Sequence, residues 1–285
     1  MNFSIVVPVK DEVDFIPRTL PSYYNVNPRE VIVCTDKPLP RKLHQVIQKV
    51  AVACDALDIT RIVEVERDPE WNFHQAHVRR TGFKKAKYDR ILTVDIDLAI
   101  NRNVLKALKL IGTNNVGLAS CIILRYPKSL VDLWRIGTIT FLRKIVHGML
   151  APFMGITMFT GLYALWKPYW LDSEPEEKIK KHVNPKQFLR GEYARGVPTD
   201  VNPTGEDTHL RDCMLEKHRC IYLHDFGAIG LRGLYEDDPC VQYMTGQYFA
   251  RRGRSLLVSL GRAFFRVQSD YLRGFLHQRN KQSSS

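Results

Sequence analysis

The chain has 285 residues, of which 45% are hydrophobic and 25% charged, and this ordinary composition excludes wholesale disorder and fibrous repeats. Its formal net charge of +12 indicates an anionic partner such as a nucleic acid, a phosphorylated substrate or an acidic membrane surface. The six cysteines form neither a CxxC pair nor the dense spacing of a disulfide framework, so we expect reduced thiols.

The sequence carries no recognisable targeting or membrane-spanning segment. The first residues enter a strand-like apolar run without the basic start and longer apolar stretch of a signal peptide. No uninterrupted apolar run reaches about 18 residues, because the most apolar stretch, 145–166, is broken by His147, Pro152, Gly155 and Gly161. We therefore expect a cytoplasmic protein.

The first hundred residues alternate apolar runs, which predict buried strands, with amphipathic segments, which predict helices. In chain order these are strand 3–9, helix 11–24, strand 30–34, helix 40–57, strand 62–65, helix 75–87 and strand 90–94. This alternation is typical of an α/β fold with a doubly wound, mainly parallel sheet.

After residue 100 the alternation is looser. The expected elements are helix 103–111, strand 116–123, helix 130–147, strand 158–166, a polar mobile segment 172–205, helix 207–219 and strand 220–223.

The C-terminal segment concentrates the positive charge. From residue 241 onward, Asp270 is the only acid beside eight basic residues, namely Arg251, Arg252, Arg254, Arg262, Arg266, Arg273, Arg279 and Lys281. A helix over 256–276 places six apolar residues on one face, namely Leu256, Leu260, Phe264, Val267, Tyr271 and Phe275. This basic amphipathic helix either lies in an anionic membrane interface or packs on the body with a solvated basic face.

Acidic residues follow three of the predicted strands. Asp11 and Glu12 come after the first, Asp36 after the second, and Asp95 and Asp97 after the fourth. Because ligands of doubly wound sheets bind beyond the carboxyl ends of the strands, we expect these clusters to converge on one edge.

The pair Asp95 and Asp97 can hold a divalent cation that also binds a diphosphate. An acidic pair at the tip of the buried run 91–94 is costly unless a cation or hydrogen-bond donors lie nearby. We favour a metal site over a merely capped loop.

Further along, Glu206 and Asp207 follow Gly205 at the start of a predicted helix. They either cap the helix N-terminus, or one of them is a general base that takes a proton from an attacking hydroxyl. His224 comes after a short predicted strand and is either structural or a metal ligand, with Asp225 as its hydrogen-bonding partner.

Five segments in order carry a family resemblance: 7–12, 33–36, 76–82, 93–97 and 205–207. Their order and spacing resemble the family 2 glycosyltransferases of the GT-A fold over about residues 3–230. The resemblance implies a UDP- or GDP-linked sugar donor, with Pro8, Asp11, Glu12 and Asp36 at the nucleotide and Arg79 at its diphosphate end.

The resemblance also assigns the remaining site residues. It implies that Asp95 and Asp97 hold Mn²⁺ or Mg²⁺ on the donor diphosphate, and that His224 completes the metal site. Gly161 resembles the glycine that lines the donor-sugar and acceptor pocket. Asp207, with Glu206 before it, matches the catalytic base.

Two segments depart from the family pattern. Thr35-Asp36-Lys37-Pro38 replaces the usual Asp-Asp-Gly-Ser, so base recognition is expected to differ, and Trp71-Asn72-Phe73-His74 replaces the usual glycine-containing pair. The Gln-x-x-Arg-Trp motif of processive synthases is absent, and so are multi-pass membrane segments, which favours non-processive transfer.

We therefore expect a single GT-A-like domain with a C-terminal basic amphipathic helix. Residues 1–100 form the donor half, 101–245 the acceptor-binding and catalytic half, and 246–285 the tail. The expected activity is metal-dependent, inverting transfer of a hexosyl group to a hydroxyl or lipid-phosphate acceptor, with a possible anionic membrane surface as partner of the tail.

Two alternatives stay open. A sugar-nucleotide pyrophosphorylase generally carries a glycine- and arginine-rich loop after the first strand, where this chain has Pro8 to Glu12. A nucleic-acid binder is disfavoured because the excess charge sits in one terminal helix, without a zinc-finger or helix-turn-helix signature.

Overall fold

The structure is a computed structural model that describes residues 1–10, 12–125, 161–180, 206–231 and 269–283, with scattered residues between 130 and 263. Several predictions lie outside the described residues. They concern Asp11, Gly205, most of the helix 130–147, the end 181–205 of the polar segment and the start 158–160 of a strand.

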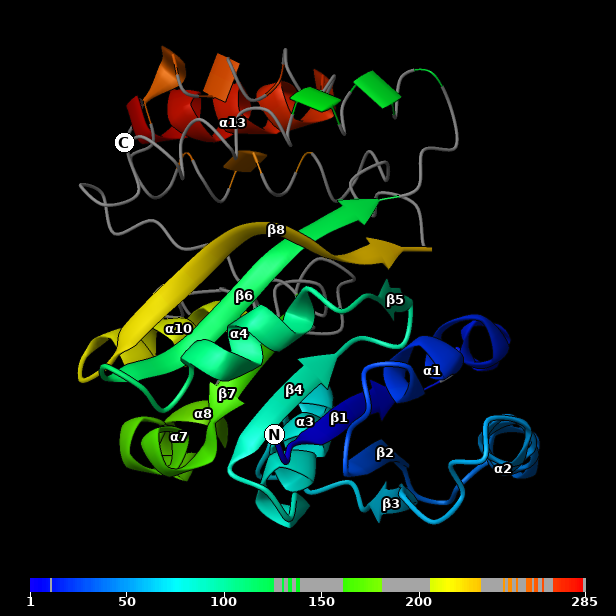
Figure 1. The fold of residues 1–285 in the computed structure, drawn as a ribbon. Coiled ribbons are helices and arrows are strands. Elements are labelled where there is room, and N and C mark those ends of the chain that lie inside the picture. Colours follow the sequence, from blue (N-terminus) through cyan, green and yellow to red (C-terminus); the bar gives the residue numbers. More distant parts are fainter. Residues whose placement is uncertain are drawn as a thin grey trace.

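The described part of the chain forms one sheet in the order β3-β2-β1-β4-β7-β6-β8-β5 (Figure 1). The strands are β1 (Ser4–Val9), β2 (Glu30–Asp36), β3 (Thr60–Val65), β4 (Arg90–Val94), β5 (Leu98–Ile100), β6 (Val116–Arg125), β7 (Leu162–Trp166) and β8 (Arg219–Gly230). The run β3-β2-β1-β4 is parallel throughout, and β6 pairs with β8 in parallel. Strand β7 is antiparallel to both neighbours, and β5 is antiparallel to β8.

The described helices are η1 (Val13–Phe15), α1 (Ile16–Tyr24), α2 (Arg41–Ala53), α3 (His74–Lys85), α4 (Val104–Leu110), α7 (Lys167–Ser173), α8 (Glu176–Lys180), α10 (Glu206–Leu215) and α13 (Ser269–Ser283). Side chains of α1, α2 and α4 pack in one buried cluster, and side chains of α3, α7 and α10 pack in another. The sheet is therefore covered on both faces, with the last three helices sharing one face.

Helix α3 approaches the sheet closely at Gly82. A Cβ there would lie 2.5 Å from Val6 Cγ1 in β1 and 2.7 Å from Cys34 Sγ in β2, which leaves no room for a side chain. This contact holds the two arginines before it, Arg79 and Arg80, beneath the sheet, where both are buried.

The α/β fold with a mainly parallel sheet is confirmed, and the first four predicted strands and three predicted helices are present within a few residues. Strand β5 has only three residues, too few to show a pattern in the sequence.

Two predictions are wrong. The polar segment expected from 172 onward starts with helical residues, because α7 runs to Ser173 and α8 follows it. The strand expected to end at 223 continues through His224 to Gly230, because pairing with β6 and β5 extends it beyond its apolar part.

Within the predicted helix 256–276, the described residues 256, 257, 259, 260 and 263 are helical, and α13 covers the end of the prediction and runs further, to Ser283. Tyr271 and Phe275 are fully buried, whereas Leu256 and Leu260 are exposed. Figure 1 shows α13 on the side of β6 and β8 that is away from β1, β2 and β3. Among the residues that the structure describes, no helix combines the length and apolarity needed to cross a membrane.

Candidate active site

The turn after β4 carries Asp95 and Asp97 and is held from two sides. The buried hydroxyl of Tyr23, in α1, lies 3.1 Å from the carbonyl oxygen of Asp95 and 2.9 Å from that of Leu98. On the other side, the amide of Leu231 donates to the carbonyl oxygen of Asp97 at 2.8 Å. The acidic turn therefore has a fixed backbone.

Arg79 joins this turn to helix α10. Its Nη2 lies 2.5 Å from Asp95 Oδ1, and its Nη1 lies 2.6 Å from Asp207 Oδ1 and 2.9 Å from Glu206 Oε1. The arginine side chain is only 2% exposed. One guanidinium group thus brings together three carboxylates from two distant parts of the chain.

Gly161, directly before β7, contacts the same two aspartates. Its carbonyl oxygen accepts the amide of Asp95 at 2.8 Å, and its amide donates to Asp207 Oδ2 at 3.0 Å. Its φ of +50° is in the left-handed region, and a Cβ would collide with the Asp95 carboxylate. Only glycine fits this position without strain.

Negative charge exceeds positive charge in this cluster. Burial, together with the charges of Asp207 and Asp97, raises the pKa of the Asp95 carboxyl, and Arg79 offsets this only in part. Burial also raises the pKa of Glu206 against the pull of Arg79. Because the Asp95 side chain is still 34% exposed, a cation from solvent can reach it.

The carboxylates fit a divalent cation such as Mg²⁺ or Mn²⁺, which prefer hard oxygen ligands. Within the described ranges, no group of three or more His, Cys, Asp or Glu side chains could hold a metal alone. Asp95 and Asp97 fit instead a site in which one or two carboxylates bind the ion and substrate phosphates and water complete its coordination.

A second group of predicted residues lies at the carboxyl ends of β1 and β2. Pro8 is buried in β1 opposite Cys34 of β2, and Glu12 accepts the amide of Lys10 at 3.0 Å in the following loop. Asp36 ends β2, and its Oδ1 lies 3.1 Å from His74 Nε2 at the start of α3. His74 ends the segment 71–74, which departs from the family pattern, and it therefore contacts the aspartate expected at the nucleotide.

An open hollow of about 480 Å³ lies beside this pair. It is lined by residues 64–69, which follow β3, and by His77 and Thr81 of α3. Asp36 is paired with Val65 in the sheet, and the rings of His74 and His77 meet edge to face at 5.8 Å. Helix α3 therefore carries two residues that line this hollow and, between them in the sequence, Arg79.

The structure does not bring His224 to the aspartates. It is exposed and lies within β8, six residues before Gly230, the end of the strand that meets the acidic turn, which at about 3.3 Å per residue corresponds to roughly 20 Å along the strand. Its neighbour Asp225 pairs with Lys106 of α4 at 2.6 Å.

Sequence reasoning missed three residues that the structure places here: Tyr23, His74 and Arg80. Tyr23 lies within a predicted helix, where it resembles an ordinary apolar-face residue. Arg80 follows Arg79, and an arginine doublet on a helix that packs against a sheet was the available signal, since charged side chains are rarely buried unless paired.

The comparisons with known proteins concern the family and the fold of the chain. The family model "Glycosyl transferase family 2" matches residues 4–168. No curated protein sequence matches the chain.

Two solved structures cover 99% of this chain at 16% identity each. The mannosyltransferase PcManGT from Pyrobaculum calidifontis, in complex with GDP-Man and Mn²⁺, has a TM-score of 0.52 and is covered over 75% of its length. TarS from S. aureus, residues 1–349, has a TM-score of 0.49 and is covered over 73%. At this identity, the likeness to PcManGT shows the fold alone.

Proposed function

Since this chain belongs to glycosyltransferase family 2 and is a glycosyltransferase, we propose that it performs metal-dependent, inverting and non-processive transfer from a UDP- or GDP-linked sugar. The observation that carries this proposal is the joining of Asp95 and Asp207 by one arginine and one glycine. The two aspartates lie far apart in the sequence and meet where parallel strands end, the usual ligand position in such sheets.

The donor half comprises residues 1–100. Its nucleotide contacts Pro8, Glu12 and Asp36 near the hollow beside β3, and Arg79 binds the diphosphate end. A guanidinium group suits this role because its fork of donors matches phosphate oxygens. PcManGT, which shares the fold, is in complex with GDP-Man and Mn²⁺, and that complex supports a nucleotide-sugar donor for this chain as well.

Asp95 and Asp97 hold the divalent cation, Mn²⁺ or Mg²⁺. When bound, the cation neutralises the charge that grows on the diphosphate leaving group. His224 is left out of this proposed metal site because of its place in β8.

Residues 101–245 form the acceptor-binding and catalytic half, with Asp207 as the general base. The acceptor hydroxyl oxygen forms a bond to the anomeric carbon while the bond from that carbon to the diphosphate oxygen breaks on the opposite face. The hydroxyl proton passes to Asp207, and the configuration inverts. Each oxygen of Asp207 already accepts one hydrogen bond, and a carboxylate has lone pairs left for the acceptor.

A lipid phosphate is the second acceptor class. Such an acceptor is already anionic, so it needs no base, and Asp207 would matter less. Asp207→Asn separates the two classes: a loss of about 10²–10⁴-fold in kcat indicates a hydroxyl acceptor, and near-normal kcat indicates a phosphate.

The proposal as a whole is tested by thermal unfolding with UDP, GDP and their sugars, with and without Mn²⁺. We expect one nucleotide series to raise Tm, and more so with Mn²⁺, since a ligand that binds only the folded state stabilises it. Hydrolysis or transfer that stays at full rate in excess chelator contradicts metal dependence. Pyrophosphate release from a nucleoside triphosphate and a sugar phosphate would indicate a pyrophosphorylase instead.

For the tail, residues 246–285, we propose contact with an anionic membrane surface that presents a lipid-linked acceptor. The support is the concentration of basic residues there and the exposure of Leu257 and Leu276. We expect the full chain to sediment with vesicles only when they contain anionic lipid, and a chain truncated after Tyr248 to stay in solution. Equal sedimentation of both chains would place the contact elsewhere.

A further inference from the structure

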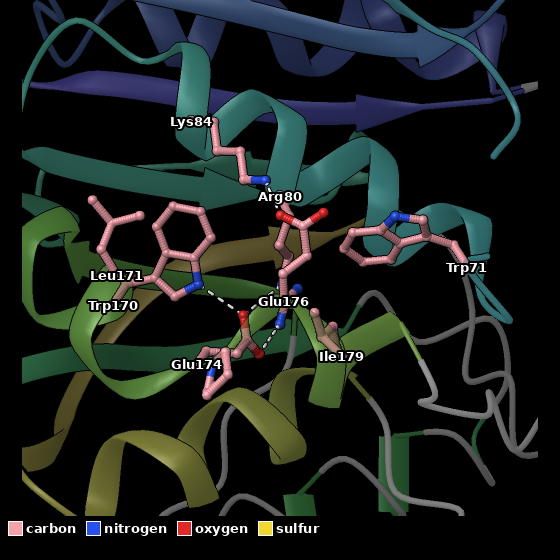
Figure 2. Close-up of a pocket in the computed structure, with 9 residues that line it drawn as sticks. Trp71, Arg80, Lys84, Trp170, Leu171, Glu174, Glu176 and Ile179 are labelled. Carbon is pink, nitrogen blue, oxygen red and sulfur yellow. Dashed lines mark hydrogen bonds and ion pairs between the residues drawn. The ribbon is translucent and has the colours of Figure 1, made fainter.

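Arg80 belongs to an ion-pair cluster that the proposed chemistry does not use. Its Nε and Nη2 donate to the two oxygens of Glu174 at 2.9 and 2.8 Å, and the Nε1–H of Trp170 donates to Glu174 Oε2 at 2.7 Å (Figure 2). The side chains of Arg80 and Glu174 are each 1% exposed. A fully buried, bidentate pair of this kind fixes both partners geometrically.

The other end of Arg80 reaches helix α10. Its Nη1 lies 2.9 Å from Glu206 Oε2, while the second oxygen of Glu206 lies 2.9 Å from Nη1 of Arg79. Glu206 is therefore shared between two neighbouring guanidinium groups. Its side chain is 7% exposed, against 18% for Asp207, so Asp207 is the more accessible of the two to an acceptor.

Arg80 and Glu174 hold each other in their ionised forms. Burial by itself would raise the pKa of Glu174, but the charge and hydrogen bonds of Arg80 outweigh it and the pKa is lowered. Burial would lower the pKa of Arg80, and the two glutamates raise it instead.

The cluster closes a ring of contacts around Asp207. The chain leads from Gly161 through β7 and α7 to Glu174, and Arg80 joins Glu174 to Glu206, the residue before Asp207. The amide of Gly161 donates to Asp207 itself. The first turn of α10 is thus held at both of its acidic residues.

Arg79 alone does not fix the position of the Asp207 carboxylate, because one of its nitrogens is shared between two carboxylates. Nη1 of Arg79 serves both Glu206 and Asp207. If Arg80 did not hold Glu206, the helix turn could move along Arg79 and take the Asp207 carboxylate with it. A shift of about 1 Å in a reacting group can lower a rate by about 100-fold.

We propose that Arg80 and Glu174 are positioning residues that fix the Asp207 carboxylate for proton transfer. This inference rests on the proposed role of Asp207 as general base. Trp170 completes the support: its ring meets Phe83 of α3 edge to face at 5.3 Å, and its N–H orients Glu174.

The test compares kcat and donor KM of Glu174→Gln and Trp170→Phe in the full chain. We expect Glu174→Gln to lower kcat by about 10–100-fold with donor KM unchanged, because only the base moves. Trp170→Phe keeps every charge and most of the packing, so it should fold and lower kcat by less. The matched control is Glu176→Gln, which removes the exposed Lys84–Glu176 pair and should leave kcat unchanged. Glu176 lines a pocket of about 220 Å³ that Arg80, Trp170 and Glu174 also line (Figure 2).

A double variant separates positioning from general support of the fold. If Glu174 acts through Asp207, then Asp207→Asn with Glu174→Gln is no slower than Asp207→Asn alone. Two results would overturn the inference while Asp207→Asn remained slow. One is that the losses in kcat of the two single variants add up in the double variant, and the other is that Glu174→Gln has the same kcat as Glu176→Gln. Full activity of Asp207→Asn would instead overturn the proposed base, and with it this role.

Discussion

Two neighbouring arginines on α3 face clusters that are built differently. Arg79 contacts Asp95, whose carboxylate is one third exposed, whereas Arg80 is enclosed between Glu174 and Glu206, which are almost fully buried. An open, incompletely neutralised cluster can exchange a protein contact for a ligand, while a closed and neutralised one only holds its parts in place. We call the residues around Arg79, with the acidic turn, the open cluster, and Arg80 with Glu174 and Trp170 the closed cluster. The open cluster is the proposed site and the closed cluster supports it, although the two share Glu206.

The largest expected effect is at the open cluster. Asp97→Asn should lower transfer by at least about 10³-fold, because the charge stabilisation that a cation supplies amounts to several kcal/mol. The measurement is donor turnover across a Mn²⁺ titration. If Asp97→Asn keeps its activity at low Mn²⁺, the acidic turn is not the metal site.

Gly161→Ala tests whether the activity requires the close contact between Gly161 and the Asp95 carboxylate. A left-handed φ costs an L-residue about 1–2 kcal/mol, and the added Cβ would displace the Asp95 carboxylate. We expect a lower Tm together with a loss of about 100-fold in kcat.

Gly117→Ala, in β6, provides the control. Its Cβ would meet the flexible end of Met214 at 2.7 Å and the Cβ of His218 at 3.2 Å, so it should cost some stability and little activity. Equal losses of activity in the two variants would mean that the fit at Gly161 has no special role.

Arg79→Lys and Arg80→Lys make the same change in the two clusters. Arg80→Lys loses a bidentate pair in a dry environment, so we expect it to lower the free energy of unfolding by about 1–3 kcal/mol and to leave the affinity for donor unchanged. Arg79→Lys should do the reverse, with a smaller loss of stability and a weaker rise of Tm on adding nucleoside diphosphate. Denaturant unfolding measures the free energy of unfolding, and thermal shift measures the stabilisation by nucleoside diphosphate. If both variants changed both quantities equally, the open and closed clusters would not differ in function.

The sequence predicts the open cluster better than the closed one. Strands β1 and β4 are apolar runs buried on both faces, so the place of Asp95 and Asp97 follows from where such a run ends. For Asp207, the place at a helix start leaves capping and proton transfer both open, and only the family resemblance singles it out as the base. The first inference uses a local pattern whose consequence in a parallel sheet is general, and the second does not.

Glu174 could not be predicted in this way. It follows a short helix in a polar segment without periodicity, and its burial depends on Trp170 and Arg80, which packing brings to it. The position of His224 was also unpredictable from local sequence, because it depends on strand pairing. Its strand looked complete at 223 because the apolar pattern stops there, whereas pairing with β5 and β6 carries the strand on.

His224→Ala gives the smallest expected effect. Because His224 is exposed and lies six residues before the end of β8 that meets the acidic turn, we expect the Mn²⁺ dependence of donor-induced stabilisation and the transfer rate to stay within about twofold of the parent chain. The natural comparison is Asp97→Asn, which should abolish the Mn²⁺ dependence in the same assay. A weaker Mn²⁺ response in His224→Ala would mean that His224 moves toward the acidic turn when donor binds. Donor binding would then complete the open cluster by adding His224 to it. The open and closed clusters would differ in mobility as well as in charge.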